Sequence, residues 1–374
     1  MQGTSFSFVA SLIAIGATAR ERGADDPTVL GTLIGASLVG ALAPLAIARW
    51  YDRMRRLITP TVTGVVITLI GLSLVKVGMN DIAGGAGEQA PSSPLNLVLA
   101  ITTLALILAC QLSRLPMVRI GSIFIGLVGG CLVAALSGAL VFPGPVSLLP
   151  SLPVPFAFGL HFDIVAIVQL AFIYVVTSIE TIGVITGTSR YSNLPTQGDA
   201  ARRRVRGAIY ADGVCSMLAA GLNSFPNTTF GQNIGVVQLT GVASRYVGIF
   251  VGVMLVGLSL LPPIGALLQA IPRPVLGGAT LLMFGLIAVS GIRMLGEGGM
   301  SQTRTLVVAL SLGAGFGVEL APQALAGLPE ALREIFSSSI VTGGLTAILA
   351  CLSIPAERGW SRPAARGEPS KSSG

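Results

Sequence analysis

Residues 227–241 read Asn227-Thr-Thr-Phe-Gly-Gln-Asn-Ile-Gly-Val-Val-Gln-Leu-Thr-Gly241, a polar, glycine-rich stretch between two long apolar segments. Lipid offers no hydrogen-bond partners, so such a backbone is tolerated at membrane depth only where it is buried in protein or lines a cavity. In membrane transporters a broken segment of this kind marks the solute site. The stretch therefore predicts a membrane protein with a binding site inside the bilayer.

Composition agrees with that class. The chain has 374 residues, of which 52% are hydrophobic and 10% charged, whereas soluble domains carry about 25% charged residues. The net charge of +7 reflects arginine-rich cytoplasmic loops, and no basic stripe interleaved with aromatics predicts nucleic-acid binding. Four scattered cysteines and one histidine, His161, show no metal-ligand spacing. We expect an all-α polytopic membrane protein without metal or cofactor.

Hydrophobic runs predict the membrane segments, since a helix needs about 20 apolar residues to span the bilayer. Arginines cluster in alternate loops, while loops 80–93 and 143–161 contain no Lys or Arg, which predicts a cytoplasmic C-terminus by the positive-inside rule. The tail beyond residue 356 is expected to be disordered. The twelve expected segments are 5–19, 28–48, 58–79, 94–111, 117–142, 162–188, 206–224, 228–243, 246–270, 274–295, 304–319 and 338–355.

A second break resembles the first. Gly3-Thr-Ser-Phe-Ser-Phe8 opens the first segment much as Asn227-Thr-Thr-Phe230 opens the eighth. Both are interpreted as short extended stretches leading into half-helices, and two such breaks indicate an inverted repeat with a site between them. The half-helix N-termini would present N–H groups to a ligand. The alternative is a pair of kinked packing helices.

Two carboxylates lie in apolar segments. Glu180 is surrounded by Ile173–Ile185, and an acid there is costly and usually functional. It is predicted to accept hydrogen bonds from a substrate or to carry a proton, with a structural carboxylate as the alternative. Asp212 is predicted to serve proton coupling, with a surface ion pair to nearby Arg206 as the alternative.

Side chains at the breaks complete the predicted site. Gln232 and Asn233 offer amide donors and acceptors that suit a flat ligand edged with alternating polar groups. One of them, Asn233 by preference, is alternatively a repair of the broken backbone. Phe6 and Phe230 flank the breaks and are positioned to stack on a planar ring, although packing is the commoner role. Thr228, Thr229 and Thr240 are expected to satisfy backbone groups.

These motifs resemble the nucleobase–ascorbate transporter family (nucleobase:cation symporter-2). The resemblance rests on residues 232–248, with three shorter stretches at 178–183, 211–213 and 274–280, and on the opening residues 2–8. The Gln-Asn pair in the signature is similar to the bacterial xanthine and uric acid permease branch, whereas uracil carriers have Glu-Asn there.

The resemblance implies two inverted repeats of seven segments and an elevator movement driven by proton symport. A core domain (1–50 and 161–272) would carry the site, and a gate domain (51–160 and 273–356) would form the homodimer contact in the cell inner membrane. Glu180 and Gln232 would bind the purine, Asn233 would shape the site, and Asp212 would serve coupling or local structure. Phe6 and Ser5 would line the pocket from the opposite break.

Two features depart from the family pattern. The chain begins inside what corresponds to the third family segment, so an N-terminally truncated chain that does not transport is expected. Val184 stands where many purine-type relatives have Asp, which leaves coupling or specificity open.

Several rivals stay open beside purine uptake. They are a uracil or other nucleobase permease, a non-transporting fragment, and an intramembrane enzyme using Glu180 and Asp212. The enzyme lacks a nucleophile, a metal set and a cofactor motif. A sulphate or bicarbonate carrier is disfavoured because an acid in the site repels anions.

Overall fold

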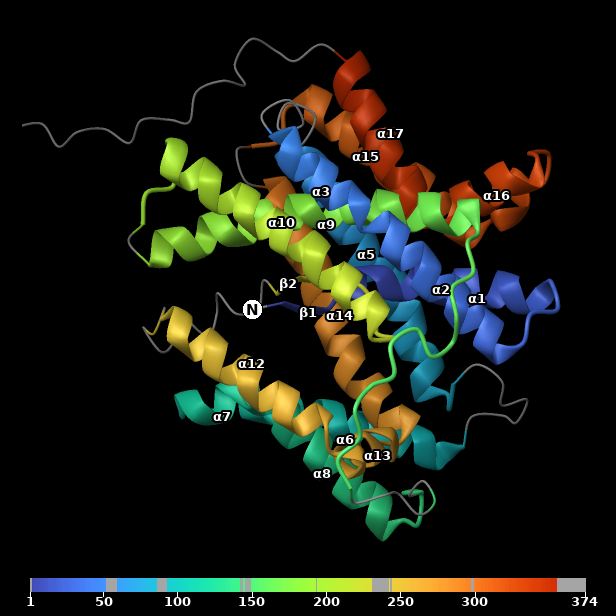
Figure 1. Cartoon of the computed structure of the whole chain (residues 1–374), viewed down its shortest axis with the longest axis vertical. Helices are drawn as coiled ribbons and strands as arrows, with labels where there is room; N and C mark the ends of the chain where they lie inside the picture. Colours follow the sequence, from blue (N-terminus) through green and yellow to red (C-terminus); the bar gives the residue numbers. More distant parts are fainter. Residues whose placement is uncertain are drawn as a thin grey trace, which may run out of the picture.

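The computed structural model describes residues 2–51, 59–85, 93–141, 144, 149–192, 194–230, 242, 244–296 and 299–354. The predicted tail beyond residue 356 lies outside these residues. The regular structure of the described part is helical apart from two short strands (Figure 1). The first half contains β1 (Gln2–Thr4), the 3-10 helix η1 (Phe6–Phe8), α1 (Val9–Glu21), α2 (Asp26–Gly40), α3 (Leu42–Arg49), α5 (Pro60–Ile82), α6 (Pro94–Gln111), α7 (Pro116–Ile120) and α8 (Ser122–Leu136). The second half contains α9 (Ile164–Tyr191), α10 (Asp199–Gly221), β2 (Asn227–Thr229), α12 (Arg245–Ser259), α13 (Pro262–Gln269), α14 (Arg273–Gly296), α15 (Gln302–Leu320), the 3-10 helix η2 (Pro322–Leu325), α16 (Glu330–Ser337) and α17 (Ser339–Ser353).

Six stretches of the described residues are long and apolar enough to cross a bilayer, and all six fall on expected segments. The short apolar helices α8 and α17 fall on two more. The predicted all-α polytopic membrane fold is therefore confirmed. The six stretches are Asp26–Arg49, Pro60–Ile82, Pro94–Gln111, Ile164–Ser189, Arg273–Gly296 and Gln302–Leu320.

The expected segment 246–270 is present but is not one straight helix. Helices α12 and α13 are bent by 87° at the break between Ser259 and Pro262. The physical reason lies in Pro262-Pro263, because a proline lacks the backbone N–H and disfavours the helical conformation of the residue before it.

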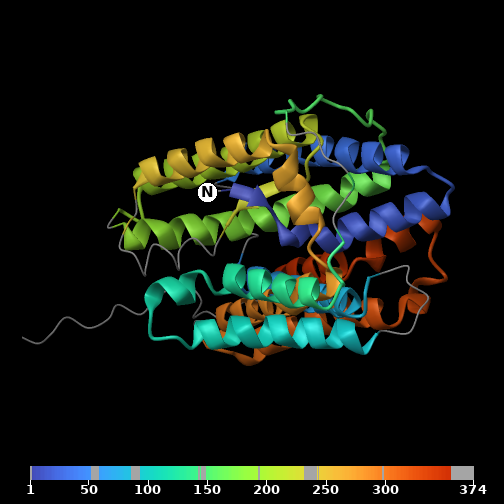
Figure 2. The same cartoon turned by 90° about the horizontal axis from the view of Figure 1, so that it is seen from below.

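The helices form two layers (Figure 2). One layer contains α1, α2, α3, α9, α10 and α12, and the other contains α5, α6, α8, α14, α15 and α17. The first layer has an apolar cluster that includes Leu12, Leu33 and Tyr174. A second cluster centres on α5 and also takes in Val176 of α9, so the two layers touch along the middle of α9.

Small residues let α5 and α14 pack closely within the second layer. A Cβ atom placed on Gly71 would lie 2.6 Å from the Cα of Ala288. Gly291 of α14 similarly faces Thr68 of α5 without room for a side chain. Such close approach of small residues fixes membrane helices against each other, and it makes this pair a firm support for the site.

The two strands meet near the middle of the molecule (Figure 1). They pair in antiparallel fashion, although more than two hundred residues separate them in the sequence. The N–H of Ser5 extends the pairing by donating to the carbonyl of Pro226 at 3.2 Å. The two predicted extended breaks are therefore confirmed. The register pairs Gln2 with Thr229, Gly3 with Thr228 and Thr4 with Asn227.

Candidate functional site

The pairing of β1 with β2 places the two broken segments side by side. Backbone groups freed from helical bonding are satisfied across the strands, which is what buried backbone requires in a membrane. The chain then turns into η1 after Ser5, whose hydroxyl oxygen accepts a hydrogen bond from the N–H of Ser7 at 3.2 Å. A hydroxyl at this position is a favoured cap, so the first helical turn begins beside the strands.

A small cavity lies where the strands meet α9 and the second layer. Its volume is about 40 Å³, which is room for about three water molecules. Four predicted substrate-binding residues, Ser5, Phe6, Glu180 and Phe230, line it together. The other described lining residues are Ser7, Ile67, Ile70, Thr228, Thr229 and Ile287.

The walls of the cavity differ in chemistry. Hydroxyls, the carboxylate and both phenylalanines come from the first layer and its strands, whereas the described lining residues of the second layer are the apolar Ile67, Ile70 and Ile287. The ring of Phe6 also meets Phe284 of α14 edge to face, with centroids 5.4 Å apart and planes at 79°. The first layer can therefore make hydrogen bonds and ring contacts to a ligand, while the isoleucines of the second layer limit the ligand's shape.

Glu180 is half-buried on α9 and faces this cavity. Within the described part of the chain, no side chain or backbone N–H donates a hydrogen bond to its carboxylate. A carboxyl group at membrane depth is expensive unless it is satisfied. The arrangement thus leaves an acceptor, or a proton site, directed at whatever occupies the cavity.

Asp212 has different surroundings. It is 3% exposed and accepts hydrogen bonds from the side chains of Gln2 (2.5 Å), Thr181 (2.5 Å) and Thr229 (2.9 Å). These donors belong to β1, α9 and β2, so one carboxylate ties both strands to the helix that carries Glu180. The alternative of an ion pair with Arg206 is wrong, because the Arg206 Nε donates instead to the carbonyl of Ala48 at 3.1 Å.

Three other predicted positions, Gln232, Asn233 and Thr240, lie outside the described residues. Thr229 bonds Asp212 through its side chain, and Thr228 lines the cavity, so neither is limited to satisfying the backbone.

The isoleucine wall was missed by the sequence reasoning. Ile67, Ile70 and Ile287 lie inside uniformly apolar helices, where nothing in the sequence distinguishes a cavity wall from a lipid face. The spacing of three between Ile67 and Ile70 shows only that they share a face of α5.

A helical bundle with several apolar spans and a partly polar cavity where two broken segments meet is the architecture of a membrane transporter rather than of an enzyme. The model of a protein family described as "Permease family" matches residues 1–324. The chain belongs to this permease family, and the predicted family resemblance is confirmed.

Curated relatives agree with that assignment. Xanthine permease XanP of Escherichia coli (strain K12) is 42% identical over 367 residues, covering 96% of this chain and 78% of XanP. Xanthine permease XanQ of the same strain is 39% identical over 359 residues, covering 95% of this chain and 77% of XanQ. A putative purine permease of Clostridium perfringens is 37% identical over 352 residues, covering 93% of this chain and 75% of its own.

Two solved structures share the fold at low sequence identity. The transmembrane domain of the cyanobacterial bicarbonate transporter BicA superimposes with a TM-score of 0.57 at 15% identity, covering 94% of this chain and 83% of its own. SLC26A9 superimposes with a TM-score of 0.64 at 12% identity, covering 94% of this chain and 57% of its own. At these identities, the two similarities show the fold alone.

Proposed function

We propose that this permease takes up a purine base, xanthine or uric acid first, by proton-coupled symport. The observation that carries the proposal is the cavity beside the paired strands β1 and β2, which Glu180, Phe6 and Phe230 line together. The names of the two Escherichia coli relatives, both xanthine permeases, support the choice of substrate.

Each side chain has a role that its chemistry suits. Glu180 accepts hydrogen bonds from ring N–H groups of the base. Phe6, at the start of η1, and Phe230, directly after β2, belong to the two opposite breaks, and both stack on the flat ring. Gln232, two residues beyond Phe230, adds amide donors and acceptors to the ring edge, and Asn233 shapes the site beside it.

Asp212 holds the site together and is a positioning residue in this proposal. Its three hydrogen bonds fix the strands against α9, and thus fix Phe230 relative to Glu180. Of the two residues predicted for proton coupling, Glu180 and Asp212, this proposal assigns the proton to Glu180, whose carboxylate faces the cavity. Glu180 then both carries the proton and binds the base, and this shared site couples proton movement to transport of the base.

Movement of the two layers supplies alternating access. A cavity of about 40 Å³ holds about three waters and is too small for a two-ring base, so the layers have to separate for loading. The layer with α9 corresponds to the proposed core domain (1–50 and 161–272), and the layer with α5 and α14 to the gate domain (51–160 and 273–356). The apolar wall lets the core slide without breaking directional bonds. We propose a homodimer in the cell inner membrane with a cytoplasmic C-terminus.

Uptake of radiolabelled xanthine by cells that lack their own purine carriers tests the function. Accumulation of xanthine by the wild-type chain would support this function and would refute the expectation that the chain does not transport; excess uric acid should then compete more strongly than uracil. Glu180→Gln and Gln232→Ala should abolish uptake at unchanged membrane expression. Normal uptake by both variants would show that the site is assigned wrongly, and preferential competition by uracil would favour a pyrimidine permease.

A further inference from the structure

A larger pocket than the central cavity lies beside the first turn of α14, where α6 and α13 come close to it (Figure 1). Its volume is about 520 Å³, which falls within the range of small-ligand sites, whereas the central cavity has about 40 Å³. We call it the α6–α14 pocket and define it by six of its lining residues: Asn96, Leu99, Val141, Gln269, Ile271 and Arg273.

The α6–α14 pocket lies where three apolar spans reach the surface of the bilayer. Span Pro60–Ile82 ends just before Gly84, which also lines the pocket, while spans Pro94–Gln111 and Arg273–Gly296 begin beside it. The ends of membrane spans lie at the level of the lipid headgroups. With the proposed cytoplasmic C-terminus, this end of the three spans belongs to the outer leaflet.

Arg273 supplies the positive charge of the pocket. Among the described residues, no hydrogen bond or ion pair joins its guanidinium to another group. Asp81 of α5 is close enough to attract the guanidinium, but it is not one of the described residues that line the pocket. Gly85 makes the room that the guanidinium occupies, since a Cβ atom there would collide with the Arg273 Nη1. The cation is thus held in place without a bound anion from the described part of the chain.

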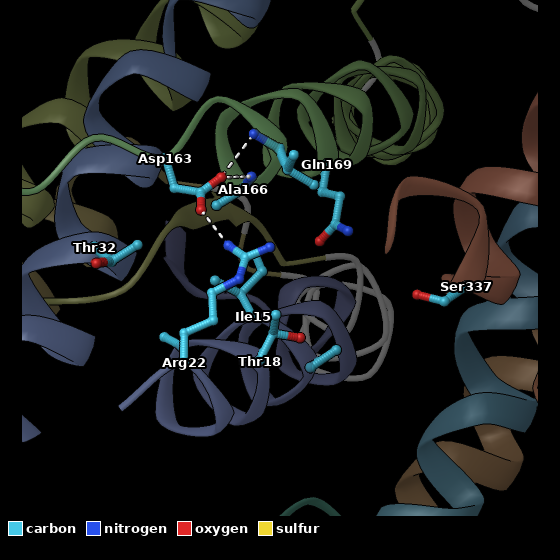
Figure 3. Close-up of a pocket in the computed structure, with 11 residues that line it drawn as sticks. Ile15, Thr18, Arg22, Thr32, Asp163, Ala166, Gln169 and Ser337 are labelled. Carbon is cyan, nitrogen blue, oxygen red and sulfur yellow. Dashed lines mark hydrogen bonds and ion pairs between the residues drawn. The ribbon is translucent and has the colours of Figure 1, made fainter. Parts of the chain in front are cut away.

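Another pocket, between α1 and α9, shows an arginine whose charge is used within the protein. Figure 3 shows Arg22 donating to Asp163, at 3.0 Å. Asp163 also accepts hydrogen bonds from the N–H groups of Val165 and Ala166 at 2.8 and 3.1 Å. That carboxylate therefore satisfies both an arginine and the start of α9, whereas the five N–H donors of Arg273 face a pocket with room for an anion.

The uncharged polar groups of the α6–α14 pocket suit hydroxyl groups on a ligand. The Asn96 Nδ2 donates to the carbonyl of Ala83 at 3.3 Å, which fixes the amide and leaves its oxygen to accept a hydrogen bond. Gln269 offers a second amide with donors and an acceptor. The described lining contains no carboxylate, so a ligand with an added ammonium group would find no opposite charge there.

Large apolar side chains flank the pocket. Leu97, beside Asn96 on α6, is 54% exposed, and Leu268, beside Gln269 on α13, is 61% exposed. Val141, in the lining itself, is 76% exposed. A small soluble anion would make no use of these surfaces, whereas acyl chains attached to a bound headgroup would pack against them. A cation at headgroup level between apolar flanks therefore favours a phospholipid.

We propose that the α6–α14 pocket binds an anionic phospholipid with a hydroxylated headgroup, of the phosphatidylglycerol type. Arg273 binds the phosphate through charge-assisted hydrogen bonds, Asn96 and Gln269 bind the headgroup hydroxyls, and the acyl chains lie along α6 and α13. The lipid also braces residues 270–272, which connect α13 of the proposed core domain to α14 of the proposed gate domain. This binding does not depend on which solute the permease carries.

Native mass spectrometry of the purified full chain tests the lipid site. Protein stripped of lipid in detergent is titrated with phosphatidylglycerol, and the Kd of the first bound lipid is measured. Arg273→Gln removes the charge that binds the phosphate. Lys76→Gln is the matched control, since Lys76 is exposed on α5 and lies outside the described lining. Asp81→Asn provides a second measurement, because it removes a carboxylate that competes with the phosphate for Arg273.

Arg273→Gln should raise the Kd for phosphatidylglycerol about tenfold, Lys76→Gln should leave it unchanged, and Asp81→Asn should lower it. Phosphatidylcholine should bind the wild-type chain more weakly than phosphatidylglycerol. A Kd that is unchanged in Arg273→Gln, or raised equally in Lys76→Gln, would overturn the proposal, and so would equal binding of the two lipids. Displacement of the lipid by excess inorganic phosphate or urate would show that the pocket takes a free anion, which would overturn it too.

Discussion

The ring of Phe230 packs directly over Gly3. A Cβ atom on Gly3 would lie 2.8 Å from two ring carbons of Phe230, closer than such atoms approach. Because Gly3 on β1 has no side chain, there is space beside the cavity for the ring of Phe230, which directly follows β2.

Gly3→Ala should displace the Phe230 ring rather than unfold the protein, because the ring is free to swing about its side-chain bonds. A lost stacking contact corresponds to about 0.5–1.5 kcal/mol, so the KM for xanthine uptake should rise about two- to tenfold at unchanged expression. Gly16→Ala is the control, since its Cβ would make an ordinary 3.6 Å contact with Val29. Equal KM values for both variants would contradict the role of the Gly3–Phe230 contact.

Asp212→Ala should destabilise the fold because two buried donors, Thr181 and Thr229, and the half-buried Gln2 lose their acceptor. Each unpaired buried donor costs about 1–3 kcal/mol, so the unfolding midpoint in detergent should fall together with xanthine affinity. Asp199→Ala, exposed on the same helix, should change neither. If Asp212→Asn keeps both stability and binding but loses only proton-driven accumulation, Asp212 is a coupling residue after all.

Gly71→Ala should weaken the contact between α5 and α14. The new methyl group would meet backbone atoms of Ala288, and overpacking of this kind costs about 1–3 kcal/mol. Thermal unfolding followed by fluorescence-detected size exclusion should show a lower midpoint. Gly285→Ala on α14 has open space around the new methyl and should unfold like the wild type; a midpoint lowered equally in both would refute the argument.

Ile287→Phe should narrow the cavity from the apolar side and discriminate ligands by size. Binding of xanthine should weaken about tenfold, which corresponds to about 1.4 kcal/mol, while a single-ring base such as uracil should be affected less as a competitor. Ile292→Phe serves as control, since Ile292 is 54% exposed on the same helix. A loss that is equal for large and small bases would mean that Ile287 does not border the ligand.

Much of the site was predictable because polar residues in apolar runs are visible in a sequence. Ser5, Phe6, Glu180 and Phe230 were identified from two broken hydrophobic segments and one isolated acid, and the structure places them around one cavity. Whether they bind substrate stays a prediction.

Other features depend on contacts that sequence order does not reveal. Gln2 and Asp212 are 210 positions apart, so the hydrogen bond that ties β1 to α10 has no local signal. Ile67, Ile70 and Ile287 look like any lipid-facing isoleucine until the layers are assembled. The bend before Pro262 did have a signal, the Pro-Pro pair, but the surrounding apolar run masked it as a single span.

The pairing of β1 with β2 also determines when the site can exist. The strand at Gln2–Thr4 finds its partner only in Asn227–Thr229, which the ribosome adds much later. At about 5–20 residues per second, that delay amounts to tens of seconds. During that time the start of the chain has to wait, protected, while the intervening helices insert. The amount of binding-competent protein in a cell thus depends on membrane insertion, and on any chaperone or insertase that shields the unpaired segment.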